Sequence, residues 1–520
     1  MTPFITMATE SLATCFSSVC STHPGRPALF AADGGMLATW GELGVRVERL
    51  RGGLTARGVR TGDRVAAWLP RGADEVALAW AVFSLGAVWM SIPWKSTVAQ
   101  VHWLAADAET MLIVGNATSC SKLGAKAGIG AVVEFEELNN DLFAPAMTPV
   151  VASDSLATLS YTSGSTGLPK GVMISHRVLL DAAARVNAYL HHRCDDRLLG
   201  LMPLNSPWGL LQGLLVAQVG GALVLPPVAV LPGELAATVR AAGVTGLAAL
   251  PPTWTLLADW LTSRGETLPG LRYITTSGGV IAPHIWQMFP KNFPHAEIFA
   301  TYGLTEAFRT TVVPPEWLAR KTGSLGQPCA GVNIAVVRDD GSEVATGEAG
   351  ELVHRGECVT LGYWRRPEDT SATFAPNPEH SWRFSEGERL HYSGDLVKRD
   401  ADGFLWFLAR RDALIKTGGF RVSAEEIEVA LVASGYARHA VVFGLPDETL
   451  GQIIAAAIEP IGTPDAAQTG VLAHARACLA SHQLPRFLYC CAGPMPLTPN
   501  GKVNRPAVIA TAKIGLGLSG

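Results

Sequence analysis

The chain has 520 residues, 48% of them apolar, so it is long enough to bury more than one hydrophobic core. Its 41 basic and 45 acidic residues give a net charge of −4, which argues against a nucleic-acid partner. Nine cysteines, an odd number without metal-ligand spacing, predict a reducing compartment. The first twenty residues lack a basic start and include Glu10, so they do not resemble a secretory signal, and we expect a cytoplasmic protein.

Helical and strand patterns alternate through the first four hundred residues, as in the predicted helix 40–56, strand 64–69 and helix 75–87. This alternation predicts an α/β fold with mainly parallel sheets covered by helices. The most apolar stretch, 208–232, contains glutamines and paired glycines and prolines, which favours a buried helix leading into a strand over a membrane span. Residues 350–408 have short strand and turn patterns that predict a small antiparallel or barrel-like subdomain.

The most specific segment is 161–172, which reads Tyr-Thr-Ser-Gly-Ser-Thr-Gly-Leu-Pro-Lys-Gly-Val. Its glycines let backbone N–H groups approach an anion, its hydroxyl residues add donors, and Lys170 adds a positive charge. Short apolar runs at 155–160 and 172–174 predict a flanking hairpin, and Ser175 is expected to cap a helix running through Leu180.

This loop has two competing interpretations. A P-loop needs Ser or Thr after its lysine, but Gly171 follows Lys170, which disfavours ordinary P-loop ATPase or kinase chemistry. A loose Gly/Ser tract is more often a flexible surface turn, and the fixed Pro and Lys positions argue against that alternative here.

The twelve-residue segment resembles the signature of the adenylate-forming (ANL) superfamily, which contains acyl-CoA synthetases, adenylation domains and luciferases. Four further blocks in the same order extend the resemblance over nearly the whole chain from about Thr39. The resemblance implies a site for ATP and Mg²⁺. The loop residues that it assigns to the nucleotide are Thr162, Ser163, Gly164, Ser165, Thr166, Gly167 and Lys170.

The first of these blocks, Thr-Tyr-Gly-Leu-Thr-Glu at 301–306, implies that Tyr302 lies beside the adenine and that Glu306 binds magnesium. ATP oxygens and one carboxylate suit a hard cation that keeps some of its waters. The second block, Tyr-Ser-Gly-Asp at 392–395, implies that Asp395 accepts hydrogen bonds from the ribose, although Ser-Gly-Asp alone is typical of a turn. The other nucleotide-binding residues that the resemblance implies are Ser277, Gly278, Gly279, Thr301, Gly303 and Thr305.

The third block, 409–422, is similar to the hinge and first strands of the small C-terminal domain of the family. By this resemblance Arg410 contacts the nucleotide, Asp412 is the hinge, and Gly418 and Gly419 line the route of an incoming thiol.

The fourth block, Pro-Leu-Thr-Pro-Asn-Gly-Lys-Val at 496–503, contains Lys502, which matches the catalytic lysine of the first half-reaction. A solvated turn lysine is the alternative. The catalytic residues implied in total are Lys502, Glu306, Thr162 and Lys170.

The expected domains are an N-terminal adenylate-forming domain at 1–409, a hinge at 410–412 and a mobile α+β lid at 413–520. Within the lid, the patterns predict three strands and one helix, at 414–416, 440–443, 453–458 and 424–434 respectively.

One segment departs from the family pattern. Members usually carry an aromatic residue and a histidine where this chain has Asn205 and Ser206. Smaller side chains would leave room in the acyl pocket for a bulkier acid, or Trp208 would take over the gating role, whereas a buried tryptophan more often fills core volume. Because no aspartate that would pair an α-ammonium group is evident at 203–212, a plain carboxylic acid is favoured.

The resemblance implies an AMP-forming acyl-CoA ligase. A substrate carboxylate attacks the α-phosphate of ATP to give an acyl-adenylate and pyrophosphate, and the thiol of coenzyme A then displaces AMP. The expected substrate is a bulky natural-product acid of secondary metabolism, for example a polycyclic one, with fatty and aryl acids still open. The expected oligomeric state is a monomer or a homodimer.

Three alternatives to this function stay open. A stand-alone ligase that loads a separate acyl carrier protein would use the same residues. A nucleotide-binding protein without catalysis is disfavoured because Glu306, Lys170 and Lys502 are all present. A luciferase-like oxygenase would differ mainly in its substrate.

Overall fold

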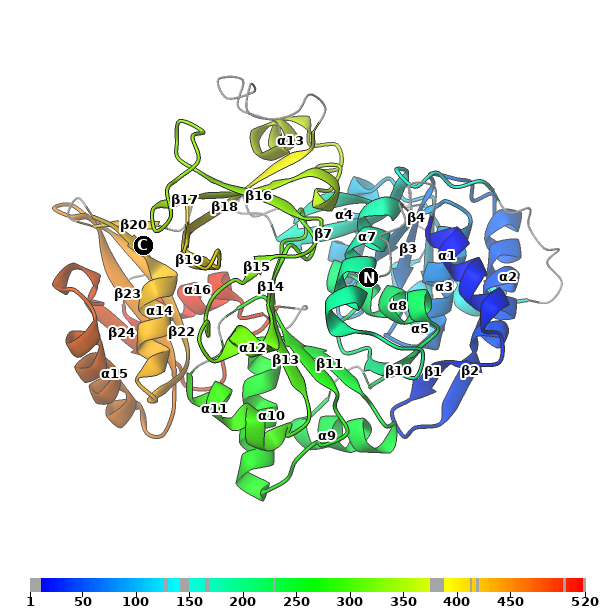
Figure 1. Cartoon of the computed structure of the whole chain (residues 1–520). Helices are drawn as coiled ribbons and strands as arrows, with labels where there is room; N and C mark the ends of the chain where they lie inside the picture. The colour runs from blue at the N-terminus through cyan, green and yellow to red at the C-terminus, as the bar shows by residue number, and fades with distance from the viewer. Residues whose placement is uncertain are drawn as a thin grey trace.

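The computed structural model describes residues 11–124, 130–140, 149–163, 169–227, 230–279, 281, 283–374, 388–411, 414–417, 420–498 and 502–517. In Figure 1 the chain runs from helices and strands at the right, through the green strands in the middle, to a separate group of orange and red elements at the left. The helices are α1 (Leu12–Thr22), α2 (Trp40–Ala56), α3 (Ala73–Ser84), α4 (Val98–Asp107), α5 (Ala117–Leu123), α6 (Phe135–Leu138), α7 (His176–Leu190), α8 (Pro207–Val219), α9 (Pro232–Ala241), α10 (Pro251–Arg264), α11 (Pro283–Asn292), α12 (Pro315–Leu318), α13 (Pro367–Phe374), α14 (Ala424–Ala433), α15 (Pro464–Cys478) and α16 (Arg505–Gly515).

Two large sheets form most of the described structure. The first consists, in spatial order, of β15 (Gln327–Pro328), β14 (Thr311–Val313), β13 (Glu297–Tyr302), β12 (Tyr273–Thr276), β11 (Gly246–Ala249), β9 (Arg197–Leu199), β10 (Ala222–Leu225), β1 (Pro27–Ala31) and β2 (Met36–Thr39). The second consists of β6 (Ala131–Glu134), β5 (Leu112–Gly115), β3 (Arg64–Trp68), β4 (Val88–Ser91), β7 (Leu156–Ser163) and β8 (Pro169–Ser175). Pairing is parallel from β13 to β1 and from β6 to β7, and antiparallel only at the edges, which confirms the predicted α/β class.

The main hydrophobic core lies between these two sheets. Side chains of α2, α3, α7 and α8 pack there with residues of β3 and β7 on one side and of β1 and β10 on the other. Its largest members include Trp40 and Trp89, both fully buried. Helices α9, α10 and α11 cover the opposite face of the larger sheet in a second core that contains Trp254 and Phe289. Helix α4 covers the outer face of the smaller sheet.

Several local predictions match the structure because local signals define the element ends. Helix α2 begins and ends where predicted. Its start is defined by Thr39 and Glu42, which form a capping box there. Ser175 accepts a hydrogen bond from the backbone of Val178 and caps α7 as expected, although that helix continues to Leu190. The predicted helix 75–87 ends earlier because Gly86 adopts a φ of 64°, which turns the chain.

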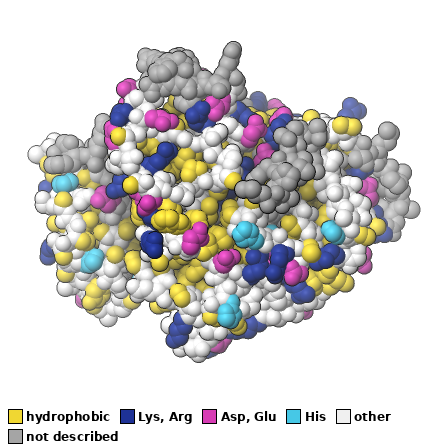
Figure 2. All heavy atoms as spheres, in the orientation of Figure 1, with side chains coloured by type: hydrophobic (Ala, Val, Ile, Leu, Met, Phe, Trp, Pro, Cys, Tyr) yellow, Lys and Arg dark blue, Asp and Glu magenta, His cyan; other side chains and the backbone are white. Residues whose placement is uncertain are grey.

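The apolar stretch 208–232 contains α8, which leads into the buried strand β10, as predicted. In the parts of the chain that the structure describes, no helix is long and apolar enough to cross a membrane. On the face in Figure 2, acidic and basic side chains are both scattered among apolar side chains.

Four strands between residues 333 and 410 form a small antiparallel sheet, in agreement with the expected change of architecture. Its strands, in order, are β16 (Asn333–Val337), β17 (Ala349–Arg355), β18 (Leu390–Arg399) and β19 (Leu405–Arg410).

The C-terminal part is α+β, as predicted. Its sheet has the order β21 (Phe420–Ser423), β20 (Leu414–Thr417), β23 (Gly451–Pro460) and β22 (Ala437–Asp447), and β24 (Phe487–Cys490) also pairs with β23. Helices α14 and α15 cover one face and α16 the other. Arg438 Nη1 lies 3.0 Å from Asp259 Oδ2 of α10, so this part contacts the N-terminal part. The proposed hinge residue Asp412 lies outside the described residues, and the domain limits stay a prediction.

Candidate active site

The signature loop joins two strands at the edge of the smaller sheet. Strands β7 and β8 form the predicted antiparallel hairpin, in which Thr162 lies opposite Lys170. Of the other loop residues, 164–168 and the Ser163 side chain lie outside what the structure describes. Lys170 Nζ lies 2.7 Å from Asp369 Oδ1 and 5.4 Å from the centre of the Tyr363 ring. The predicted phosphate-binding lysine is therefore held by an acid and an aromatic ring of a later segment.

Tyr363 connects this lysine to the predicted magnesium ligand. Its hydroxyl donates a hydrogen bond of 2.9 Å to Glu306 Oε1. Burial raises the pKa of Glu306, although the Tyr363 hydrogen bond and the Arg410 charge oppose the rise. Among the described residues, no basic side chain forms an ion pair with Glu306. A half-buried carboxylate without a basic partner fits a divalent cation whose remaining ligands are substrate oxygens and water.

The described residues contain no group of three or more His, Cys, Asp or Glu side chains that could hold a metal ion. A magnesium ion here would therefore be held by Glu306 and not by a cluster of such side chains in the described part of the chain.

The predicted adenine and ribose residues lie in one hydrogen-bonded cluster. The Tyr302 hydroxyl donates to Asp395 Oδ2, while Arg410 Nη1 donates to Asp395 Oδ1 at 2.7 Å and to the Ser393 carbonyl at 3.0 Å. Only 4% of the Asp395 side chain is exposed. Burial and the neighbouring carboxylate raise the pKa of Tyr302, which keeps its hydroxyl protonated as a donor. The His354 ring supports Tyr302 from one side, with the ring centres 6.1 Å apart.

A second cluster joins the ends of β12 and β13, which are neighbouring parallel strands. Thr301 Oγ1 donates to the Thr276 carbonyl at 3.0 Å and accepts from Arg309 Nη1 at 2.6 Å. A side chain at Gly303 would come within 2.7 Å of the Arg309 backbone nitrogen, so this position needs glycine. The predicted residues Ser277, Gly278 and Gly279 follow β12 directly, and Thr305 precedes Glu306 in the segment after β13.

Lys502 reaches the same place from the other end of the chain. A Cβ built on Gly278 would lie 3.3 Å from Cε and 3.5 Å from Nζ of Lys502. The residue keeps exposed surface, but its tip lies against the N-terminal part, and this burial lowers its pKa while the Glu306 charge opposes the change. The turn that carries Lys502 is closed by the hydrogen bond from Thr498 N to the Lys502 carbonyl, 2.6 Å long.

A cavity lies between α7, α8 and strands β11 and β12. Its lining is mostly apolar and includes Trp208, Tyr189, Tyr273, Gln212, Thr275 and Arg309. Trp208, predicted for the acyl pocket, is half-buried and lines this cavity.

The other two residues predicted for the acyl pocket have local roles. Ser206 caps α8: its hydroxyl accepts from Gly209 N at 3.1 Å and donates to the Pro203 carbonyl at 3.0 Å. The carbonyl of Asn205 accepts from Ser160 Oγ at 3.3 Å.

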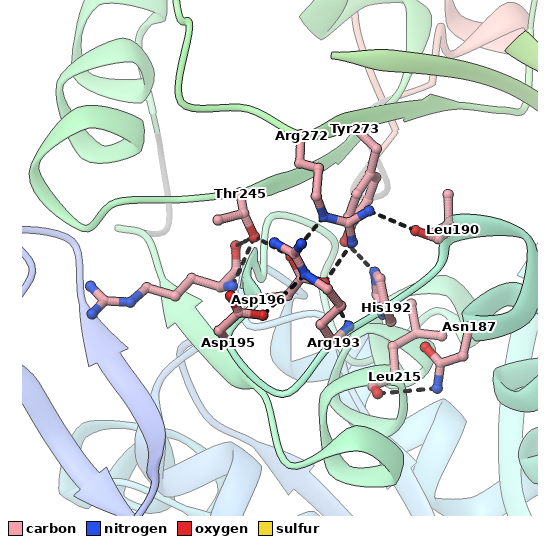
Figure 3. Close-up of polar contacts among 11 residues, drawn as sticks. Asn187, Leu190, His192, Arg193, Asp195, Asp196, Leu215, Thr245, Arg272 and Tyr273 are labelled. Carbon is pink, nitrogen blue, oxygen red and sulfur yellow. Dashed lines mark hydrogen bonds and ion pairs between the residues drawn. The ribbon is translucent and has the colours of Figure 1, made fainter. Parts of the chain in front are cut away.

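A polar network stabilises the far end of this cavity (Figure 3). Arg272 forms an ion pair with the buried Asp196, and Thr245 Oγ1 donates to Asp196 Oδ1 at 2.8 Å. The Tyr273 hydroxyl is hydrogen-bonded to His192 Nε2. Burial lowers the pKa of His192 to about 4, so this histidine is neutral at pH 7. These contacts link the starts of β9, β11 and β12 and fix the Tyr273 ring that faces the cavity.

The structure thus brings together Thr162, Lys170, Glu306, Tyr302, Asp395, Arg410, Thr301 and Lys502 from distant segments. Gly418 and Gly419 lie outside the described residues. Sequence reasoning missed Tyr363, Asp369 and Arg309. No sequence motif marks Tyr363 or Asp369, whereas Arg309 stands three residues after Glu306, at the edge of a recognised block.

Comparison with known proteins decides the family. The pattern of the family described as AMP-binding enzyme matches residues 16–364, and that of the AMP-binding enzyme C-terminal domain matches residues 426–502. The chain belongs to the AMP-binding enzyme family. Its adenylate-forming ancestry and its ligase class, predicted from the signature blocks, are thereby confirmed.

Curated relatives differ in their acceptors. The chain is 31% identical to an L-proline–[L-prolyl-carrier protein] ligase of Streptomyces coelicolor, over 81% of this chain and 82% of that protein. It is 28% identical to a sulfoacetate–CoA ligase of Cupriavidus necator, over 95% of this chain and 97% of that protein. Some relatives are far longer, and the chain spans only 44% of one and 14% of another. The relatives support activation of an acid by adenylation, but they differ in the acceptor of the acyl group.

The fold of this AMP-binding enzyme matches solved structures. The O-succinylbenzoate coenzyme A synthetase of Bacillus subtilis, in complex with ATP and magnesium, superimposes with a TM-score of 0.83 and 24% identity, over 95% of this chain and 99% of that one. This likeness confirms the fold, with a large N-terminal domain and a small C-terminal domain.

Proposed function

We propose that this chain is an AMP-forming acyl-CoA ligase, which activates a carboxylic acid with ATP and Mg²⁺ and transfers the acyl group to coenzyme A. The observation that carries the proposal is the approach of Lys502 to Gly278, at the end of β12, on the side where Glu306 follows the neighbouring strand β13. Ligands of open parallel sheets bind at the carboxyl ends of the strands. The chain therefore presents an ammonium group and an unpaired carboxylate at one such edge.

In the first half-reaction, an oxygen of the substrate carboxylate attacks the α-phosphorus of ATP. The bond from that phosphorus to the bridging oxygen breaks, and pyrophosphate leaves with the electron pair. The step needs positioning and charge neutralisation rather than a protein nucleophile. Lys502 would bridge the carboxylate and the α-phosphate, and Lys170 with Thr162 and the loop after it would hold the departing pyrophosphate. Magnesium, when bound at Glu306, supplies neutralisation of the phosphate oxygens.

The nucleoside half would rest on the cluster around Asp395. Tyr302 and Arg410 each donate a hydrogen bond to this carboxylate, and the carboxylate oxygens would accept from the ribose hydroxyls. The aromatic face of Tyr302 suits stacking with the adenine.

In the second half-reaction, the thiol sulfur attacks the acyl carbon, the bond from that carbon to the phosphate oxygen breaks, and AMP leaves while the thiol proton passes to solvent. A thiol with a pKa of about 8.5 needs no strong protein base. Lys502 occupies the site in the conformation described here, so the thiol needs a rearrangement. Rotation at Asp412 would withdraw Lys502 and present Gly418 and Gly419.

The substrate prediction is a plain carboxylic acid, with a bulky natural-product acid favoured by the small side chains at Asn205 and Ser206. The carrier-protein alternative has its own support, since one relative at 31% identity loads a carrier protein.

Both alternatives are tested by acid-dependent pyrophosphate release over a panel of aliphatic, aryl and polycyclic acids, with and without coenzyme A. Mass detection identifies the product. An acyl-CoA product supports the proposal and names the acid class. Turnover only with a pantetheinylated carrier protein supports the alternative. The absence of pyrophosphate release with every acid of the panel contradicts both.

A further inference from the structure

Arg309 occupies an unusual position in the candidate acyl pocket. The residue is only 6% exposed. Its guanidinium carbon lies 4.3 Å from the centre of the Trp208 ring, and its Nη1 donates to Thr301. The side chain also lines the cavity between α7, α8, β11 and β12. A buried charge thus faces a mostly apolar space.

No acidic group balances this charge. Among the described residues, Arg309 forms no ion pair, and its Nη1 donates a hydrogen bond to a neutral threonine hydroxyl. The neighbouring Arg272 is different, because it forms an ion pair with Asp196 (Figure 3). Neither of these two residues lines the cavity. Burial lowers the pKa of Arg309, but a guanidinium stays charged at neutral pH. Since an isolated buried charge is costly, such a group usually meets a counter-ion.

A second donor in the same cavity also lacks a partner. Within the described residues, the hydroxyl of Tyr189 makes no hydrogen bond, and the Arg309 charge acts directly on this group. Two other polar side chains of the lining are engaged: Gln212 bonds the backbone of Met202 and Leu199, and Tyr273 bonds His192. The Arg309 cation and the Tyr189 hydroxyl therefore remain for a ligand.

The position of the two donors suits contact with the acid substrate rather than with the nucleotide. The cavity lining includes Thr275, two residues before Ser277, and Arg309, whose Nη1 donates to Thr301 at the end of β13. The cavity is narrow in this conformation, about 10 Å³, so an acid whose reacting carboxylate lies at Lys502 would enter it only after lining side chains such as Trp208 shift.

We propose that Arg309 and Tyr189 bind a second anionic group, a carboxylate or a sulfonate, on the acid that this enzyme activates. This inference rests on the proposed ligase function and makes it more specific. The guanidinium, held flat on the Trp208 ring, would donate to the anion in a charge-assisted contact, and the Tyr189 hydroxyl would add one further hydrogen bond. The substrate class is then a dicarboxylic or sulfonated carboxylic acid.

The test compares matched acids that differ only in the distal group: hexanoate with adipate, and 4-methylbenzoate with terephthalate. Initial rates of pyrophosphate release give kcat/KM for the unaltered protein, Arg309→Met, Arg309→Lys and Tyr189→Phe. The control is Arg264→Met, since Arg264 also lies over a tryptophan, 5.0 Å from the Trp260 ring, but is exposed on α10.

The unaltered protein is expected to prefer the diacid of a pair. Truncating one partner of a buried ion pair weakens binding by about 30-fold or more, so Arg309→Met should lose that factor for the diacid and not for the monoacid. Tyr189→Phe should lose about 5-fold for the diacid only. Arg309→Lys should recover part of the preference, and the control should leave it unchanged.

Equal losses for both acids of a pair would overturn the proposal, because Arg309 would then act on the reacting carboxylate or on the fold. A preference of the unaltered protein for the monoacids would overturn it as well. Calorimetric titration of adipate and hexanoate without ATP is independent of catalysis. If pyrophosphate release fails with every acid, the ligase function fails, while tighter adipate binding that Arg309→Met abolishes still supports the anion site.

Discussion

The tip of Lys502 lies against Gly278, so that a single added methyl group at the glycine would be 3.5 Å from the lysine nitrogen. The two residues are more than two hundred positions apart, and they meet because the C-terminal part rests on the edge of the larger sheet. This contact places the ammonium group where Glu306 acts on its pKa. Under the proposed function, this arrangement corresponds to the first half-reaction.

Magnesium dependence should change with pH in a defined direction. Burial raises the pKa of Glu306, so the carboxylate proposed to bind the cation ionises at a higher pH than an ordinary glutamate does. The Mg²⁺ concentration that gives half-maximal pyrophosphate release should therefore fall as pH rises through that pKa. Tyr363→Phe removes a hydrogen bond to the carboxylate, which should raise the pKa of Glu306 further and move the midpoint of this fall in the required Mg²⁺ concentration to higher pH.

The control for this series is Glu368→Gln on α13, an exposed residue that should leave the midpoint unchanged. Glu306→Gln should abolish the magnesium-dependent step. A downward shift in Tyr363→Phe would contradict the assignment, since the hydrogen bond would then not stabilise the ionised form.

Two glycines of α8 provide a matched test of packing at the candidate pocket. A Cβ at Gly209 would lie 1.9 Å from the Pro203 carbonyl oxygen, whereas a Cβ at Gly213 meets nothing within 4 Å. Gly209→Ala should destabilise the protein by about 2 kcal/mol, because the start of the helix must shift. Gly213→Ala should stabilise it by about 1 kcal/mol through helix propensity. Urea denaturation measures the free energy of unfolding of both variants. Equal effects would show that the turn at 203–209 moves to accommodate the added methyl group.

The network in Figure 3 should contribute to stability in acid. Burial alone raises the pKa of Asp196, but hydrogen bonds from Arg272, Arg193 N and Thr245 outweigh it and lower the pKa below the ordinary value. The stabilisation is then fully present above pH 3.8, the unfolded value, and is lost as pH falls through the lower folded pKa.

Asp196→Asn should cost about 3 kcal/mol at pH 7, since it leaves Arg272 without its partner. The exposed pair Arg240–Glu266 is the comparison, and Glu266→Gln should cost less than about 1 kcal/mol. Thermal unfolding at pH 7 and near pH 3 measures both. An Asp196→Asn protein as stable as Glu266→Gln would show that the ion pair is not required.

Local chemistry explains why so much of the fold could be predicted from the sequence. Capping residues such as Thr39 and Ser175 mark helix starts, and apolar periodicity marks the parallel strands. The signature blocks brought most candidate site residues to attention because each block is a local motif whose glycines and hydroxyl residues follow one another in the chain.

The remaining site residues are defined only by tertiary contacts. Tyr363 gains a role because its hydroxyl meets Glu306 across 57 positions, and Arg309 because its guanidinium rests on Trp208. Ser206 carries a local signal, because Pro207 follows it and the structure shows Ser206 as the cap of α8. Its place in the acyl pocket stays a prediction.

The central claim is that Lys502 serves adenylation and not thioester formation. The most direct measurement compares both half-reactions in Lys502→Ala, with Lys513→Ala of α16 as the control. Acid-dependent pyrophosphate release measures the first half, and acyl-CoA formed from supplied acyl-adenylate measures the second. We predict that Lys502→Ala loses pyrophosphate release by about 100-fold or more while thioester formation stays near that of the control. Equal loss of both halves, or undiminished adenylation, would contradict the account.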